Sequence, residues 1–243
     1  MNRAEKILIL GLAALSSLFL PACGTTVSGP ELAELSPLVA SSVVLHSVSY
    51  LADYSQDGAL PFTCEVRMRS DGSIRRDYVW KDENDAEKKV SIVISDRGAV
   101  RIEDGKAVAI DDSDTEMTRF FAGLVFAPDR IVSSADESVR TAPDGGPVYV
   151  YGVRLNGVPG VETCVLNVDP GSRLWTGLLV RMKSGMETVS SFSAYETFAG
   201  VTYPSRIVSS TGDGGAPALC IIRDVKINPE LPDELFQFSD TNG

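Results

Sequence analysis

Residues 62–80 read FTCEVRMRSDGSIRRDYVW, and this stretch decides the fold class. From 62 to 69, apolar residues alternate with polar ones, which puts an apolar row and a polar row on opposite faces of an extended strand. Residues 70–73 have the composition of a turn, and 74–80 resume the alternation. The stretch therefore predicts an antiparallel β-hairpin.

The same period of two recurs along the rest of the chain, with short Gly- and Asp-containing links. It predicts further strands at 89–95, 99–103, 107–110, 148–155, 161–168, 174–182, 188–198, 201–209 and 218–226. A succession of short strands with few helices favours a mainly β (α+β) fold, built on one highly curved antiparallel sheet. A closed barrel and a two-sheet sandwich are the competing architectures.

A helix interrupts the strands. The segment 114–125 (DTEMTRFFAGLV) begins with cap-forming residues and carries large apolar residues at helical spacing. These are Met117, Phe120, Phe121 and Leu124. We expect this helix to lie on or inside the curved sheet. Further helices are predicted at 38–52, where apolar residues are closely spaced, and at 128–134.

The N-terminus has the plan of an export signal, with a weakly cationic start and an apolar run that ends in Leu20-Pro21-Ala22-Cys23. These four residues match the bacterial lipobox. The match implies that residues 1–22 are a signal peptide and that Cys23 carries a diacylglyceryl anchor to the membrane. Residues 23–30 are then a flexible tether, and 31–243 a single domain. The alternative is a free cysteine at the end of an ordinary signal peptide.

Charge and cysteine usage exclude several classes of function. The formal net charge of −11 disfavours nucleic-acid binding, which needs clustered Lys and Arg. With His46 as the only histidine and no CxxC spacing, no metal site is predicted, and no G-x-S-x-G motif indicates a hydrolase. We therefore expect neither a cofactor nor catalysis. Cys64, Cys164 and Cys220 either contribute one disulfide and one free thiol or are all buried structural cysteines.

Four passages resemble the LolA/LolB-like superfamily of lipoprotein localisation factors, which includes lipid-carrying lipoproteins. They are 72–78, 165–170, 198–207 and the closing segment 225–238. The resemblance implies an unclosed barrel of about eleven strands with inserted lid helices. Its concave face is expected to hold acyl chains of a lipoprotein or lipid, for transport or sorting in the envelope. The exposed apolar loop residue of the receptor has no clear counterpart in this chain.

Two other functions stay open. The first is a sensor or interaction module on the same fold, with an envelope protein as partner. The second, less favoured, is an envelope hydrolase. Gly24 follows Cys23 where an aspartate would signal retention in the inner membrane, so we expect a lipid-anchored protein that faces the periplasm, preferably from the outer membrane.

The predicted ligand-binding residues are the apolar rows of the strands and of the inserted helix. They are Val66, Met68, Tyr78, Trp80, Phe120, Phe121, Leu124, Leu178, Val180, Phe192, Phe198 and Ile207. The alternative is that these side chains fill a closed core. Arg76 interrupts its apolar row and is predicted either to contact the lid helix or a lipid head group, or to be an exposed arginine at an edge.

Overall fold

The computed structural model describes residues 43–126, 132–141, 147–155, 158, 160–169, 172, 174–212 and 214–238. The predicted signal peptide, Cys23 and the tether 23–30 lie outside these residues. One antiparallel sheet of thirteen strands dominates the structure. Its strands are β1 (Ser47–Gln56), β2 (Phe62–Arg69), β3 (Ile74–Lys81), β4 (Glu87–Ser95), β5 (Gly98–Glu103), β6 (Lys106–Ala109), β7 (Val132–Thr141), β8 (Pro147–Leu155), β9 (Val161–Val168), β10 (Trp175–Met182), β11 (Glu187–Phe198), β12 (Val201–Thr211) and β13 (Ala218–Ile227).

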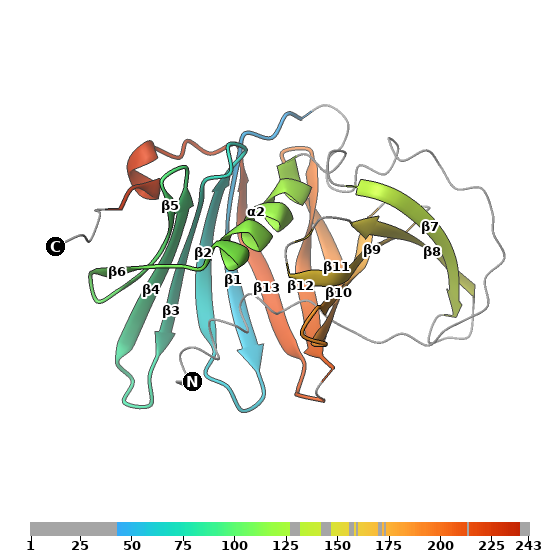
Figure 1. The fold of residues 1–243 in the computed structure, drawn as a ribbon, viewed down its shortest axis with the longest axis horizontal. Coiled ribbons are helices and arrows are strands. Elements are labelled where there is room, and N and C mark those ends of the chain that lie inside the picture. Colours follow the sequence, from blue (N-terminus) through green and yellow to red (C-terminus); the bar gives the residue numbers. More distant parts are fainter. Residues whose placement is uncertain are drawn as a thin grey trace.

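The sheet is two meanders joined at their centre (Figure 1). Strand order runs from β6 to β1, then from β13 back to β7, and the first and last strands in sequence pair with each other. The edge strands β6 and β7 stand at opposite ends of this order, so the sheet is not closed into a barrel. The predicted curved, unclosed antiparallel sheet with an inserted helix is therefore confirmed. Thirteen strands are present, where about eleven were expected.

The first of the two additional strands is β1, which overlaps the helix predicted at 38–52. That prediction is wrong for residues 47–52, which pair with β2 on one side and β13 on the other. Val48, Tyr50, Ala52 and Tyr54 recur with a period of two and turn toward the main apolar cluster. Pairing with β2 and β13 decides the conformation of this segment, because tertiary contacts override a weak local preference for helix.

The second additional strand is β7. A helix was predicted at 128–134, but residues 132–134 begin this strand, which pairs antiparallel with β8. Residues 128–131 lie outside the described part of the chain. As with β1, the backbone hydrogen bonds offered by a neighbouring strand outweigh local helical tendency.

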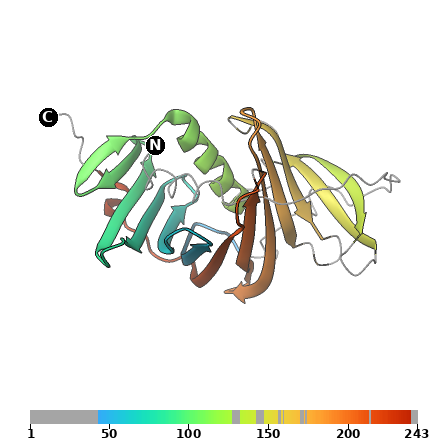
Figure 2. The same ribbon diagram turned by 90° about the horizontal axis from the view of Figure 1, so that it is seen from below.

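The helix α2 (Asp112–Phe126) lies in the connection between the two edges of the sheet. Because β6 and β7 are the outermost strands on opposite sides, the chain between them has to cross a face of the sheet. α2 makes this crossing, and Figure 2 shows it spanning the hollow side of the curved sheet. The predicted helix at 114–125 is confirmed, and its position over the sheet follows from topology.

A local bulge in β13 increases the curvature. Asp224 has a positive φ angle of 55°, which residues other than glycine adopt rarely. Asp224 lies where the register between β1 and β13 shifts, between Ser49 and Leu51. An extra residue of this kind bends its strand and strengthens its twist. The sheet therefore curls around α2 without closing.

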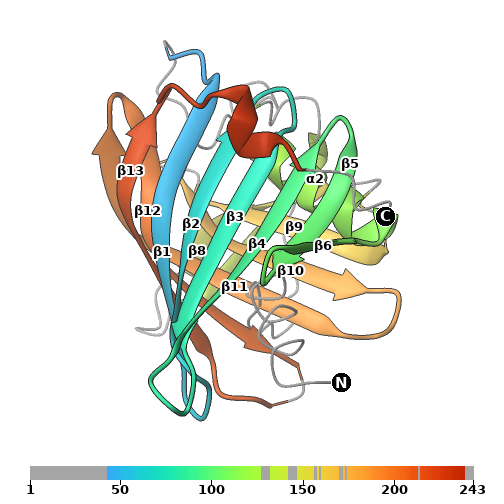
Figure 3. The same cartoon turned by 90° about the vertical axis from the view of Figure 1, so that its left-hand side faces the viewer.

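The closing segment folds over the outer face of the sheet, on the side opposite α2 (Figure 3). The 3₁₀-helix η3 (Asp233–Phe236) places the Phe236 ring against Val93 and Val100, and only 4% of Phe236 is exposed. Upstream, the Asn228 side-chain oxygen accepts hydrogen bonds from the backbone of His46 (2.7 Å) and Ser47 (3.3 Å). The segment thus secures both the outer face and the start of β1.

Candidate functional site

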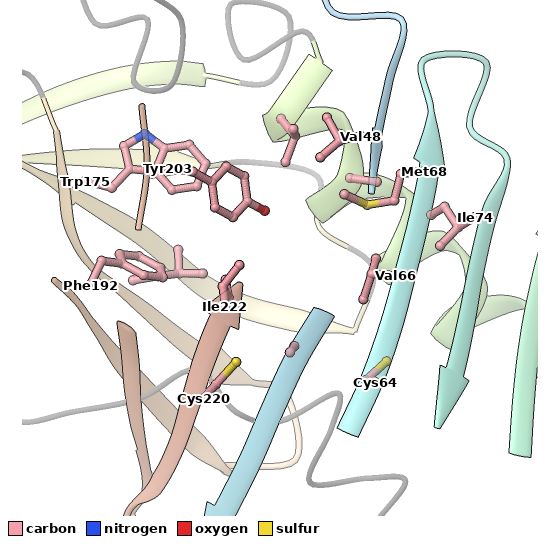
Figure 4. Packing of buried hydrophobic residues seen from close by; sticks show 14 of the residues in the cluster. Val48, Cys64, Val66, Met68, Ile74, Trp175, Phe192, Tyr203, Cys220 and Ile222 are labelled. Atoms are coloured by element: carbon pink, nitrogen blue, oxygen red, sulfur yellow. The ribbon is translucent and has the colours of Figure 1, made fainter. Parts of the chain in front are cut away.

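The inner face of the sheet and the underside of α2 share one continuous apolar cluster. It draws on strands from both meanders, with Val66 and Met68 on one side and Trp175, Phe192 and Tyr203 on the other. Figure 4 shows these side chains facing one another across the curve of the sheet. The cluster therefore joins the two halves of the fold beneath the helix.

Small side chains form the stripe by which α2 contacts this cluster. Thr115, Thr118, Ala122 and Val125 are its buried residues at helical spacing. Phe120 and Phe121, expected on the buried stripe, are half-buried and meet edge to face with ring centroids 5.6 Å apart. Arg119 ties the helix to the sheet, since its Nη2 donates to the Ser95 carbonyl at 2.5 Å. The large aromatic side chains consequently flank the contact.

The structure brings the predicted lining residues together but divides them into two groups. Val66, Met68, Tyr78, Leu178, Val180 and Phe192 are buried, with at most 9% exposed, and pack against protein. Trp80, Phe120, Phe121, Phe198 and Ile207 are partly buried on the same cluster. Leu124 lies in α2, and its side chain is not described. The second group keeps part of its apolar surface exposed to solvent.

An aromatic group lies where the hairpins β1–β2 and β3–β4 end. Tyr54 stacks on Phe62 with ring centroids 4.5 Å apart, and Phe62 tilts against Tyr78 at 5.9 Å. Next to it is an open pocket of about 640 Å³, whose lining takes Tyr54, Phe62 and Trp80 from the inner row of these strands and Asp53, Thr63, Val79 and Ile221 from the outer row. This rim pocket therefore borders both faces of the sheet at the ends of the strands.

Arg76 lies in the middle of this apolar surface. Its neighbours across the two ladders are Val66 and Ile92, and along the strand Ile74 and Tyr78, all of them members of the inner cluster. β3 is an internal strand, so Arg76 is not at an edge. Burial is the largest influence on its pKa and lowers it, but the surrounding Tyr and Cys side chains outweigh that influence and raise the pKa. Arg76 is thus a permanent cation facing inward.

The tyrosines around Arg76 are kept neutral. Burial raises the pKa of Tyr78 and of Tyr203 to about 12, and raises that of Tyr50 well above its ordinary value. The rings of Tyr50 and Tyr203 lie 5.6 Å apart, across the junction of the two meanders. These hydroxyls remain hydrogen-bond donors at any physiological pH.

Cys64, Cys164 and Cys220 are free and buried. The alternative with buried structural thiols therefore holds, and no disulfide joins any two of them in this structure. Burial raises the pKa of each thiol to about 12, which leaves almost no thiolate for nucleophilic chemistry.

The sequence missed part of this surface. Tyr50 lay inside the helix predicted at 38–52, and Tyr54 followed that helix, so neither was assigned to a strand. Trp175 and Tyr203 were not selected because one sheet face cannot be told from the other by alternation alone. The Trp175 indole N–H is buried and has no hydrogen-bond partner in the described structure.

No protein-family model and no curated protein matches the sequence. Among solved structures, a LolA superfamily protein from Nitrosomonas europaea superimposes with a TM-score of 0.53 at 14% identity, covering 80% of this chain and 90% of that one. The chain has the LolA-like fold. A putative outer membrane lipoprotein-sorting protein domain from Vibrio parahaemolyticus, at 7% identity, gives 0.47 over 80% of this chain and 90% of that one.

Within the LolA-like sheet and the rest of the described chain, no cluster of three or more His, Cys, Asp or Glu side chains has the arrangement of a metal site. Nor does any helix in the described ranges combine the length and apolar character needed to cross a membrane.

Proposed function

We propose that this chain is a lipid-anchored envelope protein that binds the acyl chains of a lipoprotein or lipid on the inner face of its sheet, beneath α2, for transport or sorting. The observation that carries the proposal is the partly buried apolar group Trp80, Phe120, Phe121, Phe198 and Ile207 around a helix laid across an open sheet. A closed core would leave no such surface facing inward.

The energetics of binding are those of simple burial. Each methylene removed from water contributes ~0.8 kcal/mol, so a chain that is only partly covered already binds usefully without any reacting group. The rim pocket of about 640 Å³ falls within the usual range for small-molecule sites. The LolA-like fold supports the proposal. The lipobox at Cys23 supports the anchor, and Gly24 the preference for the outer membrane.

The two tryptophans of the chain make the proposal testable without a label on the protein. Trp80 and Trp175 both belong to the inner surface, so intrinsic fluorescence reports on this face alone. A twelve-carbon acyl probe brominated near its end is titrated into the full chain held in lipid nanodiscs, with empty nanodiscs to correct for partitioning. Saturable quenching is expected. Absence of quenching at every probe concentration overturns the proposal.

A matched pair of variants locates the binding face. Ile207 is partly buried on the inner face, whereas the next residue, Val208, is half-buried on the outer face and does not line the rim pocket. We expect Ile207→Asn to weaken quenching and Val208→Asn to leave it unchanged, with thermal unfolding of both variants confirming the fold. Equal effects of the two changes would argue against binding on the inner face.

A further inference from the structure

Arg76 has no anionic partner in the described chain, and its side chain is hydrogen-bonded to the neutral Tyr78 hydroxyl. No carboxylate of the described chain lies within the 4.0 Å that defines an ion pair with it, although other arginines of β2 and β3 are all paired. The only buried acidic side chain in the described residues is Asp77, and its partners Arg67, Arg75 and Ser91 all lie on the outer face. The inner face of this acidic protein therefore carries a cation that has no anionic partner in the described chain.

Such an arrangement costs stability. Arg76 is half-buried, and a charge partly removed from water with no opposite charge beside it loses hydration that apolar neighbours such as Val66 and Ile92 cannot replace. Arginine offers five N–H donors in a planar fork that matches the oxygens of a carboxylate or phosphate. An anion that docks on Arg76 would restore the missing interaction.

A second, independent observation concerns Trp175. Its side chain is 8% exposed, and its indole nitrogen is one of two buried side-chain nitrogen or oxygen atoms in the described structure that have no hydrogen-bond partner. The indole nitrogen is a donor only, and Tyr50 and Tyr203 lie between it and Arg76 in the strand order of the inner surface. The inner face thus holds a cation without a counter-charge and an N–H donor without an acceptor.

We propose that the inner face selects an anionic amphiphile, whose carboxylate or phosphate binds Arg76 and whose acyl chain runs along β3 toward Trp80 at the end of the strand. Residues 76 and 80 are on the same face and about 13 Å apart along the strand. This inference rests on the proposed function and adds to it the charge of the ligand and its orientation, with the head group deep and the chain toward the rim.

The test compares head groups at constant chain length. Brominated twelve-carbon probes that end in a carboxylate, a phosphate or an alcohol are titrated into the full chain in nanodiscs, with Trp80 and Trp175 as reporters. We expect the two anions to bind at least about tenfold more tightly than the alcohol, as a charged hydrogen bond contributes to affinity. Inorganic phosphate alone is expected not to compete at millimolar concentration, since it lacks the chain.

Variants assign the preference to one residue. Arg76→Met should reduce the affinity for both anions to that for the alcohol, while Arg76→Lys should retain part of the difference. Arg206→Met is the matched control, because Arg206 is an exposed arginine on the outer side of β12. The Arg206→Met variant should bind all three probes with the same affinities as the unaltered chain.

The outcomes distinguish failure of acyl binding from failure of the preference for an anionic head group. Equal affinity for anion and alcohol in the unaltered chain overturns the charge selectivity, and this comparison needs no variant to fold. A preference that survives Arg76→Met overturns the role of Arg76, and strong competition by inorganic phosphate would show a site for a free anion. Absence of quenching by every probe overturns acyl binding itself, and with it this inference.

Discussion

Arg76 and Asp77 are adjacent in the chain, yet their side chains leave β3 on opposite faces of the sheet. The carboxylate of Asp77 accepts from Arg67 at 2.6 Å, Arg75 at 2.9 Å and Ser91 at 2.5 Å. No carboxylate of the described chain pairs with Arg76. The period of two along a strand thus separates an anion with ion-pair partners on the outer face from a cation without one on the inner face.

Replacing Arg76 by methionine should stabilise the ligand-free chain. The change removes a poorly hydrated charge and keeps a long side chain against Val66 and Ile92, so we expect a gain on the order of 1 kcal/mol in the free energy of unfolding. Urea denaturation of the delipidated chain measures it. A loss of stability would instead show that Arg76 supports the fold, for example through α2.

Asp77 should make the fold sensitive to acid. Burial is the largest influence on its pKa and raises it, but the hydrogen bonds from Arg75, Ser91 and Arg67 prevail and lower the pKa to about 2. Because the unfolded chain takes up this proton first, its contribution is complete above about pH 4 and is lost as the pH falls toward 2. The contribution is about 2 kcal/mol. Asp77→Asn should flatten this part of the curve of unfolding free energy against pH.

Phe236→Ala tests the closing segment. The ring fills the outer cluster with Val93 and Val100, and Arg69 lies over it at 5.1 Å from the ring centroid. We expect a loss of about 3 kcal/mol in the free energy of unfolding. Asp233→Asn is the control, since this residue of η3 is exposed and its ion pair with Arg69 should contribute under about 1 kcal/mol. If Asp233→Asn lowered the free energy of unfolding as much as Phe236→Ala, the ion pair and not the ring would account for the stability of this segment.

Gly177 is required by a close approach of the neighbouring strand. A Cβ there would lie 2.7 Å from the Ser190 carbonyl oxygen, whereas at Gly212 it would meet nothing nearer than 3.6 Å. Gly177→Ala should therefore cost about 1 to 3 kcal/mol in the free energy of unfolding, and Gly212→Ala close to none. Thermal unfolding of the pair decides this, and two equally stable variants would contradict it.

The three buried cysteines should resist alkylation. With thiol pKa values of about 12, only about one molecule in ten thousand carries a thiolate at each site at pH 8. Iodoacetamide should label Cys64, Cys164 and Cys220 only after urea is added, as peptide mass mapping will show. Two cysteines that stay unlabelled in urea until a reductant is added would indicate a disulfide between them.

The sequence by itself determined the strands that carry their own alternation. In β2 each apolar residue is followed by a polar one, and in β3 Ile74, Tyr78 and Trp80 share one face, so the hairpin and its two faces follow from local pattern and turn chemistry. The helix α2 was likewise predicted from its N-terminal cap residues and from the helical spacing of its apolar residues. β1 and β7 could not be predicted in this way, because these segments become strands through the strands that pair with them, which are β2 and the distant β13 for β1 and the neighbouring β8 for β7.

The tertiary structure alone decided which side chains are exposed on the inner surface. Phe120 and Phe121 were expected to be buried on the contact stripe, but α2 settles on Thr118 and Ala122, because smaller side chains allow the helix to approach the sheet more closely. Whether Arg76 has a partner depends on strands and loops that meet only in the folded chain. Alternation tells which residues share a face, whereas pairing, helix position and curvature determine which of them a ligand can reach.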